Sequence, residues 1–330
     1  MRVFVTGGTG FVGGAVVRCL LQYGFEVVAF ARQGADLRQL QGLPVNITEG
    51  DLSTVEIMKK AMLGCDWVFH VAGLYAFWGY SWEQFYESNV QGTRNVLAAA
   101  LDVGVQRVVH TSSIAVLGPP RQGDTADENT STKYQDLIGF YKRSKYLAEE
   151  VVAEFISRGL PVVMVNPSAP VGAGDWKPTA TGRVIVDYLN NKMPAFVESH
   201  QNLVDVEDVA SGHVLAAQKG VFGERYILGG ENMTLKQYLD ILSEVSGLPK
   251  VRKQIPYGVA LGWSYIDIFL AKVIKGYNPR ATPTAVKVGK VHSYYDSSKA
   301  KRELGYDPHP VREALKKAVE WYRANGYVLK

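Results

Sequence analysis

The sequence predicts an α/β fold, in which a doubly wound parallel sheet is followed by a smaller C-terminal α/β domain. Three observations support this. Short apolar strands alternate with helical patterns in the first half, a glycine-rich turn joins the first strand to the first helix, and the spacing loosens after Pro167. Alternating strands and helices are typical of a parallel sheet with helices on both faces. Because 330 residues exceed the usual size of one core, we expect two domains.

The first domain is expected to cover residues 1–167. Its last strand runs into Asn166-Pro167, where the sheet is expected to close. Its strands are predicted at 2–6, 26–31, 67–71, 107–111 and 161–165, and its helices begin at Phe11 and cover roughly 89–103 and 134–158.

The second domain is expected to cover residues 168–330. Its elements are shorter and lie between loops rich in proline and glycine. Parallel sheets of this kind often include strands from later in the chain, so the boundary between the two domains need not be sharp. We expect helices near 182–190 and 205–219, a strand at 226–228 and a helix that begins at Thr234.

Composition excludes several classes of protein. The 36 basic and 32 acidic residues give a formal charge of +4, and no basic run is long enough to bind nucleic acid. Cys19, Cys65 and six scattered histidines show no metal-ligand spacing. The first strand begins at Arg2, which leaves no room for a signal peptide, and no stretch approaches the ~18 apolar residues of a membrane span. We therefore expect a cytoplasmic protein without a metal.

A glycine-rich turn lies between the first strand and the first helix. Gly7, Gly10 and Gly13 are spaced G-x-x-G-x-x-G, and Phe11 and Val12 begin the helix. Glycines at such positions permit a tight turn, close approach of the backbone to a pyrophosphate and close packing of helix on strand. The five residues therefore predict the dinucleotide-binding turn of a Rossmann domain.

The end of the second strand favours NADP(H). This position often carries an acid that binds the ribose hydroxyls, but here the strand ends at Arg32 and no acid follows before Asp36. A guanidinium pairs with a 2′-phosphate, whereas a carboxylate repels it. NAD is the alternative, with Arg32 as a solvated loop side chain. Asp51 and Leu52 follow the next expected strand, where an adenine is contacted.

A serine, a tyrosine and a lysine form the candidate catalytic set. Tyr141 and Lys145 are spaced i, i+4 in a helical pattern, so their side chains share one face. Ser113 ends a Thr-Ser-Ser cluster after a buried strand, at the sheet edge where such folds bind ligands. Reduction of a carbonyl requires a proton donor, and oxidation of an alcohol requires a base.

The three residue types suit this chemistry. A phenol with a pKa of ~10 is a poor base at neutral pH, and lowering that pKa by ~3 units requires about 4 kcal/mol. The positive charges of Lys145 and of the oxidised nicotinamide stabilise the phenolate and so lower the pKa of Tyr141. Tyr141 is therefore expected to carry the proton. Ser113 donates a hydrogen bond to the substrate oxygen. Asn89 is either a proton relay or a structural hydrogen-bonding group, and we favour the structural role.

Together these residues resemble the extended short-chain dehydrogenases/reductases, the NAD-dependent epimerase/dehydratase family. The resemblance covers nearly the whole chain. It includes the motifs His70-Val71-Ala72-Gly73, Asn89-Val90-Gln91-Gly92-Thr93 and Val204-Asp205-Val206-Glu207-Asp208-Val209-Ala210. It implies that Ser113, the second serine of the pair, is the catalytic one. It also implies cofactor contacts by Tyr141 and Lys145 and, at strand ends, by Ala72, Thr111, Asn166 and Pro167.

Within that family, some stretches are similar to hopanoid-associated sugar epimerases and to dihydroflavonol-4-reductase-like proteins. These are 166–172 (NPSAPVG), 177–179 (KPT) and 226–232 (YILGGEN). One departure is Asp205, where many relatives carry histidine or tyrosine. No residue indicates a nucleotide diphosphate site, so a UDP-sugar substrate is not implied.

Two apolar segments give hints about the substrate. Tyr75, Phe77 and Trp78 follow the strand that ends near Ala72, and their aromatic faces suit sugar rings or flat apolar ligands. Trp82, Phe85 and Tyr86 have helical spacing and are expected to pack a helix on the sheet. Further on, an amphipathic helix carries an apolar stripe of Trp263, Ile266, Phe269, Leu270, Val273 and Ile274.

We expect this stripe to be buried in its own domain, as most such stripes are. The alternative is a surface helix that contacts a membrane or lines a lipid channel.

The leading functional hypothesis is an NADP(H)-dependent oxidoreductase that acts on a carbonyl or alcohol of a sugar-like or terpenoid-linked small molecule. A sugar epimerase with tightly bound NAD(P) uses the same catalytic residues and is the first alternative. A non-catalytic dinucleotide-sensing protein is the second, although such proteins commonly lose the Tyr/Lys pair. Homodimers are common among relatives, but nothing in this sequence marks an interface.

Overall fold

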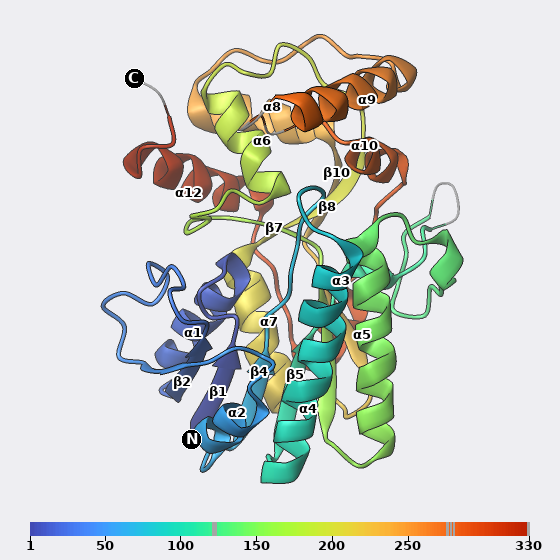
Figure 1. Ribbon diagram of the computed structural model, residues 1–330. Coiled ribbons are helices and arrows are strands. Elements are labelled where there is room, and N and C mark those ends of the chain that lie inside the picture. Colours follow the sequence, from blue (N-terminus) through green and yellow to red (C-terminus); the bar gives the residue numbers. More distant parts are fainter. Residues whose placement is uncertain (121–123, 275–276, 278, 280, 329–330) are drawn as a thin grey trace.

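The computed structural model describes residues 1–120, 124–274, 277, 279 and 281–328. Its centre is a seven-stranded sheet in the order β3-β2-β1-β4-β5-β6-β9, in which all neighbouring strands are parallel (Figure 1). This confirms the predicted fold class. The strands are β1 (Arg2–Thr6), β2 (Glu26–Ala31), β3 (Asn46–Glu49), β4 (Trp67–His70), β5 (Arg107–Thr111), β6 (Val162–Pro167) and β9 (Arg225–Leu228).

Helices cover both faces of the sheet. Side chains alternate along each strand, so Val3 and Val5 of β1 enter one core layer while Phe4 enters the other. The first layer contains α1 (Phe11–Gln22), α7 (Val206–Lys219) and α11 (Ser298–Leu304). The second contains α2 (Val55–Met62), α4 (Gly92–Val103) and α5 (Phe140–Ser157).

The second half of the chain returns to this sheet. The sequence predicts that the sheet closes at Asn166-Pro167, but β9 pairs beyond β6 as a seventh strand, and Tyr226, Ile227 and Leu228 are fully buried. Helix α7 packs along α1, and a Cβ at Gly212 of α7 would lie only 2.6 Å from Leu228 Cδ2. The strand and the helix therefore pack together as parts of the first layer.

The rest of the second half forms a smaller unit at the carboxyl ends of the strands (Figure 1). Its three-stranded sheet has the order β10-β8-β7. The strands are β7 (Ala169–Val171), β8 (His200–Asp205) and β10 (Glu231–Thr234), and the helices are α6 (Ala180–Leu189), α8 (Leu235–Ser246), α9 (Tyr257–Val273), α10 (Pro283–Lys290) and α12 (Val311–Ala324).

Two expected helices have different bounds in the structure. The one predicted over 134–158 is a short 3-10 turn (Tyr134–Asp136) followed by α5, and Gly139 with φ of 88° separates them. Tyr141 therefore lies in the first turn of α5. The helix predicted over 89–103 begins earlier, because α3 (Trp82–Phe85) continues through a π-helical turn (Tyr86–Gln91) into α4.

Helix α9 is inverted relative to the expectation. Ser264 and Asp267 are fully buried, whereas most of the apolar stripe, including Trp263, Ile266 and Phe269, faces outward. The expectation that this stripe is buried in its own domain is therefore wrong. Asp267 on the polar face accepts hydrogen bonds from the Tyr277 hydroxyl (2.5 Å) and from Ala281 N (2.8 Å). Because of these bonds, the polar face of α9 is turned toward the protein. Across the described residues, every helix is too short or too polar to span a bilayer.

One buried carboxylate joins the two units. Asp208 of α7 accepts hydrogen bonds from His309 N (2.7 Å) and from His309 Nδ1 (2.6 Å), just before α12 begins. The hydrogen bond and the charge of Asp208 raise the pKa of His309 above its ordinary value. Protonation of His309 therefore strengthens this link.

The stability that His309 contributes depends on pH. A raised folded-state pKa means that the imidazolium stabilises the fold below about pH 6.5 and that this contribution is lost as the pH rises through the folded pKa. Since His309 is exposed, the contribution is at most about 1 kcal/mol. We expect His309→Asn, which keeps a neutral donor, to lower Tm more at about pH 5.5 than at about pH 8.5. A loss of Tm that is equal at both pH values would contradict this.

Candidate active site

The glycine turn is closed against the end of β4. Gly7 has a φ of 77°, and a Cβ at this position would lie 2.5 Å from Ala72 N. A Cβ at Gly13 would lie 2.0 Å from Gly7 O, so any side chain there would collide with the backbone of the turn. Only glycine fits both positions, which explains the spacing seen in the sequence.

The N-terminus of α1 suits a phosphate group. Its N-cap is Gly10, which provides no side-chain hydrogen bond, and its first turn contains no acid. The N–H groups of this turn, around Phe11 and Val12, therefore have no capping side chain, and the helix dipole favours an anion in front of them. These residues fit the pyrophosphate of a dinucleotide.

Three residues surround the expected adenosine end. Arg32 is exposed just after β2, and among the described residues nothing hydrogen-bonds or pairs with its guanidinium. Asp51 is engaged locally, because its Oδ1 accepts from Ser53 N (3.0 Å) and Ser53 Oγ (2.9 Å). The carbonyl of Leu52 accepts from Asn95 Nδ2 (2.9 Å). Arg32 is thus a cation at this edge that remains available to a ligand.

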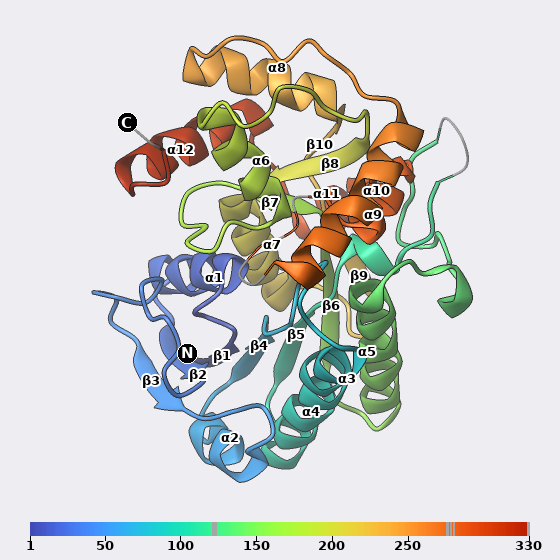
Figure 2. The ribbon, with the colours of Figure 1, turned by 45° about the horizontal axis from the view of Figure 1, so that its top comes forward.

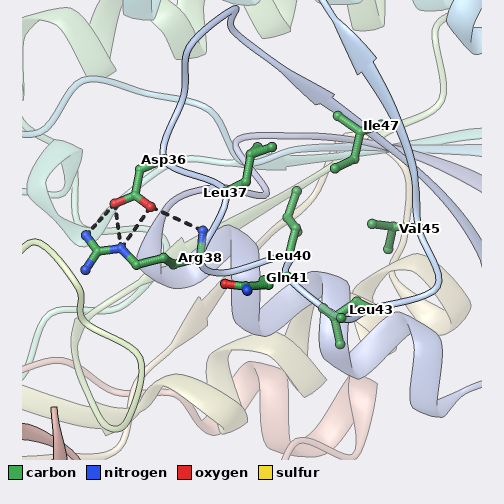
Figure 3. A pocket seen from close by; sticks show the side chains of 9 residues that line it. Asp36, Leu37, Arg38, Leu40, Gln41, Leu43, Val45 and Ile47 are labelled. Carbon is green, nitrogen blue, oxygen red and sulfur yellow. Dashed lines mark hydrogen bonds and ion pairs between the residues drawn. The ribbon is translucent and has the colours of Figure 1, made fainter.

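The loop between β2 and β3 encloses a surface hollow of about 490 Å³. Figure 3 shows its aliphatic lining beside the Asp36–Arg38 ion pair: Leu37, Leu40, Leu43, Val45 and Ile47. The pair is short (2.5 Å), and Arg38 also stacks over Trp176, 4.4 Å from the ring centroid. The hollow lies at the β3 edge of the sheet, whereas α5 covers β5 and β6, so it is separate from the catalytic candidates.

The structure brings Ser113, Tyr141 and Lys145 together. Ser113 follows β5, and its hydroxyl, which accepts from Ala115 N (3.1 Å), lies close enough to Tyr141 in the first turn of α5 to influence the pKa of that phenol. One turn further along α5, Lys145 is buried and its Nζ donates to Thr111 O (2.7 Å). A phenol, a hydroxyl and an ammonium therefore lie at the carboxyl end of β5, as the spacing predicts.

Burial sets the protonation of this group. It raises the pKa of Tyr141, although the nearby hydroxyl of Ser113 opposes the shift. Burial also lowers the pKa of Lys145 to about 8, against the opposing charge of Glu149. At neutral pH the phenol is therefore protonated and the lysine largely charged, a state suited to giving a proton to a substrate oxygen.

A carboxylate beneath the site was not anticipated from the sequence. Glu149 Oε1 accepts from Ser112 Oγ (2.5 Å) and Asn166 Nδ2 (3.1 Å), and Oε2 pairs with Arg225 (3.0 Å). Asn166 Nδ2 also donates to Ser113 O (3.0 Å). The spacing of four residues from Lys145 to Glu149, which continues the face of Tyr141, is the signal that could have identified it.

The side chain of Asn166 is thus directed beneath Ser113, and Pro167 beside it is buried. Ala72 lies against Gly7, and Thr111 is hydrogen-bonded through its hydroxyl to His213 (2.8 Å). A cofactor contact by these four residues remains a proposal.

Asn89 fixes the segment that follows β4. Its Oδ1 accepts from Leu74 N (2.6 Å), and its Nδ2 donates to Leu74 O (3.0 Å) and to Ser144 Oγ (2.9 Å). The side chain is buried and occupied by these bonds. This geometry favours the structural role over a proton relay.

The segment held by Asn89 carries the aromatic residues that were proposed to contact substrate. The ring of Tyr75 meets Tyr141 edge-on, with centroids 4.8 Å apart, and Phe77 packs against Tyr75 at 5.5 Å. Tyr75 and Trp78 remain exposed. Trp82 and Phe85 instead pack against Phe140, 5.9 and 6.3 Å away, so they anchor α3 on α5.

Comparison with known proteins agrees with this geometry. A model of the NAD-dependent epimerase/dehydratase family matches residues 3–229. The chain belongs to that family. Its members include reductases and epimerases that act on small molecules with a nicotinamide dinucleotide cofactor, and this protein is an enzyme of that reductase or epimerase type.

Several relatives of this family member align over their whole length. A Synechocystis sp. protein with the provisional name dihydroflavonol 4-reductase is 43% identical, with 98% of this chain and 95% of the relative covered. Sterol demethylase protein B of Methylococcus capsulatus is 35% identical, with 99% and 100% covered. The crystal structure of gox2253 superposes with a TM-score of 0.89 at 39% identity, covering 99% of both chains.

The available guanidinium at the end of β2 predicts a preference for NADPH. We expect Arg32→Ala to weaken NADPH binding by about 10- to 100-fold, the range for a lost hydrogen bond to a charged group, and to leave NADH binding unchanged. Dissociation constants for both nucleotides would be measured by fluorescence titration.

Arg94→Ala is the matched control, because Arg94 is an exposed arginine that pairs with Glu154 on the surface of α4 and α5. If Arg32→Ala weakens both nucleotides equally, or neither, the proposed contact with the 2′-phosphate is wrong.

Proposed function

We propose that this protein is an NADP(H)-dependent reductase of a ring carbonyl on an apolar, terpenoid-like molecule, with Tyr141 as the proton donor. One observation carries the proposal: Ser113, Tyr141 and Lys145 lie together beneath the aromatic segment of Tyr75, Phe77 and Trp78. Such a site offers a proton and an apolar surface at the same place.

Each residue has a separate task in this mechanism. A bound nicotinamide supplies the hydride. Ser113 donates a hydrogen bond to the carbonyl oxygen and holds it beside Tyr141, which gives the oxygen its proton. Lys145 keeps a positive charge near the developing alkoxide and, in the reverse direction, near the phenolate. The glycine turn binds the pyrophosphate, and Arg32 binds the 2′-phosphate.

The protonated state of Tyr141 supports reduction in particular. Burial raises the pKa of this phenol, so it holds its proton at neutral pH until an alkoxide forms beside it. An epimerase must take a proton and return it in each turnover, and it recycles its cofactor without a net need for NADPH.

The aromatic segment and the names of relatives support an apolar substrate. Tyr75, Phe77, Trp78 and Tyr80 bring no charge to the mouth of the site. The two relatives described above are named for a dihydroflavonol and a sterol, both fused-ring molecules. Flat apolar rings pack well on aromatic faces, whereas a nucleotide diphosphate requires cations.

Tyr141→Phe is the direct test of the proton donor. We expect it to lower kcat by about 10²- to 10⁴-fold, the usual contribution of a general acid, while the dissociation constant for NADPH stays unchanged. Turnover would be followed by NADPH consumption with steroid, flavonoid and terpenoid ketones.

The same assay separates the alternatives. Full activity in Tyr141→Phe would point to a different acid. If the purified wild type retains NAD, exchanges sugar epimers and consumes no NADPH with any ketone, the protein is an epimerase rather than a reductase.

The lysine predicts a pH dependence. Its pKa of about 8 means that Lys145 is charged below that pH and loses its charge above it. We expect kcat/KM for NADPH, which reports the free enzyme, to fall as the pH rises through about 8. In Lys145→Arg, whose charge persists, kcat/KM should be lower overall but flat over this range. An equal fall in both proteins would assign the titration to another group.

A further inference from the structure

Helix α9 presents an apolar surface that no described part of the chain covers. Phe269 is 63% exposed, and its exposed neighbours on the helix and just after it include two aromatic residues. We call this set the α9 face: Val259, Trp263, Tyr265, Ile266, Phe269, Val273 and Ile274. Other exposed apolar residues occur in loops and in smaller groups, whereas these seven lie along one helix and the residue that follows it.

The orientation of this helix is fixed by its opposite side. Ser264 and Asp267 are fully buried, and Asp267 accepts hydrogen bonds from the Tyr277 hydroxyl and from Ala281 N. Helix α10 packs against α9, and Lys290 Nζ lies 4.8 Å from the ring of Tyr257. Turning the α9 face inward would expose this polar side, so the outward position is a built feature of the fold.

Basic residues are concentrated in the part of the chain that contains the α9 face. The stretch 247–295 contains eight lysines and arginines but a single acid, the buried Asp267. The rest of the chain has 28 basic and 31 acidic residues. Exposed Lys272 lies on α9 itself, and exposed Lys287 and Lys290 lie on α10, which packs against α9; we call these three lysines the cationic rim. An apolar centre with a cationic rim complements a surface that is apolar inside and anionic outside.

We propose that the α9 face docks this protein on an anionic lipid bilayer. A helix with aromatic and aliphatic residues on one face and lysines beside them is suited to lie in the plane of the headgroups. Trp263 and Tyr265 belong to the residue types that concentrate at this interface. A two-fold dimer through the same face is disfavoured, because it would bring the two cationic rims together.

The docking surface adjoins the candidate site. Helix α9 belongs to the smaller unit at the carboxyl ends of the central strands, and α10 packs against it (Figure 2). In α10, Thr284 Cγ2 lies 2.9 Å from where a Cβ of Gly139 would be, two residues before Tyr141. If the proposed function is right, an apolar ketone dissolved in the bilayer has a short path to Tyr141.

Vesicle co-sedimentation of the full-length protein tests the docking. We expect the wild type to sediment with vesicles of phosphatidylcholine and phosphatidylglycerol, and to bind vesicles of phosphatidylcholine alone much more weakly. Phe269→Glu should reduce binding by about tenfold or more, since it removes buried apolar area and adds a repelled charge. Lys272→Ala should reduce it by about fivefold, and added salt should weaken the wild type.

Leu63→Glu is the matched control, because Leu63 is 60% exposed at the distant end of α2. It should sediment like the wild type, and circular dichroism should show that every variant is folded. Absence of wild-type binding to anionic vesicles, or equal binding by Phe269→Glu, would overturn the proposal. So would a wild-type dimer that Phe269→Glu converts to a monomer, in protein that does not bind vesicles.

The outcome is independent of catalysis. Tyr141→Phe should bind vesicles like the wild type whether or not Tyr141 is the proton donor. Conversely, Phe269→Glu should still reduce a water-dispersed ketone at the wild-type rate if the proposed function is right, so a failure of either proposal can be recognised separately.

Discussion

The carboxylate of Glu149 receives polar groups from the ends of three neighbouring strands. Ser112 follows β5, Asn166 lies in β6 and Arg225 begins β9, and all three bind this one side chain of α5. A buried carboxylate is stable only when its oxygens are satisfied, so the strand ends and the helix are held in one arrangement. Ser113, which follows Ser112, and Tyr141, two turns before Glu149 on α5, lie on the two elements that this link joins.

Local patterns were enough to predict most strands of the first half, although they did not predict α2. The bounds of β1, β2 and β5 agree with the predicted ranges, and the glycine turn lies where its spacing places it. In these segments, strand periodicity and backbone sterics operate over a few residues, so the sequence contains the necessary information. The same holds for Tyr141 and Lys145, whose shared face follows from helical geometry.

The features that were not predicted depend on contacts between distant segments. A strand was predicted at 226–228, but its place in the first sheet is set by its pairing with β6. Glu149 gains its role from Arg225, 76 positions further along the chain. The amphipathic pattern of α9 showed that one side is apolar but not which side faces the protein. The orientation of α9 is set by the hydrogen bonds of Asp267 with Tyr277 and Ala281 in the following segment.

Asn89 holds the backbone at the start of the aromatic segment independently of the side chains that follow. Both of its bonds to Leu74 are made with backbone atoms, so the base of the segment is held whatever side chains follow. Residues 75–80 can therefore be exchanged in evolution while Ser113 and Tyr141 keep their places. If these residues contact the substrate as proposed, point mutations in this short stretch would change specificity while the catalytic residues stay in place. Asn89 would thus allow the aromatic segment to vary while it keeps the backbone of that segment in place.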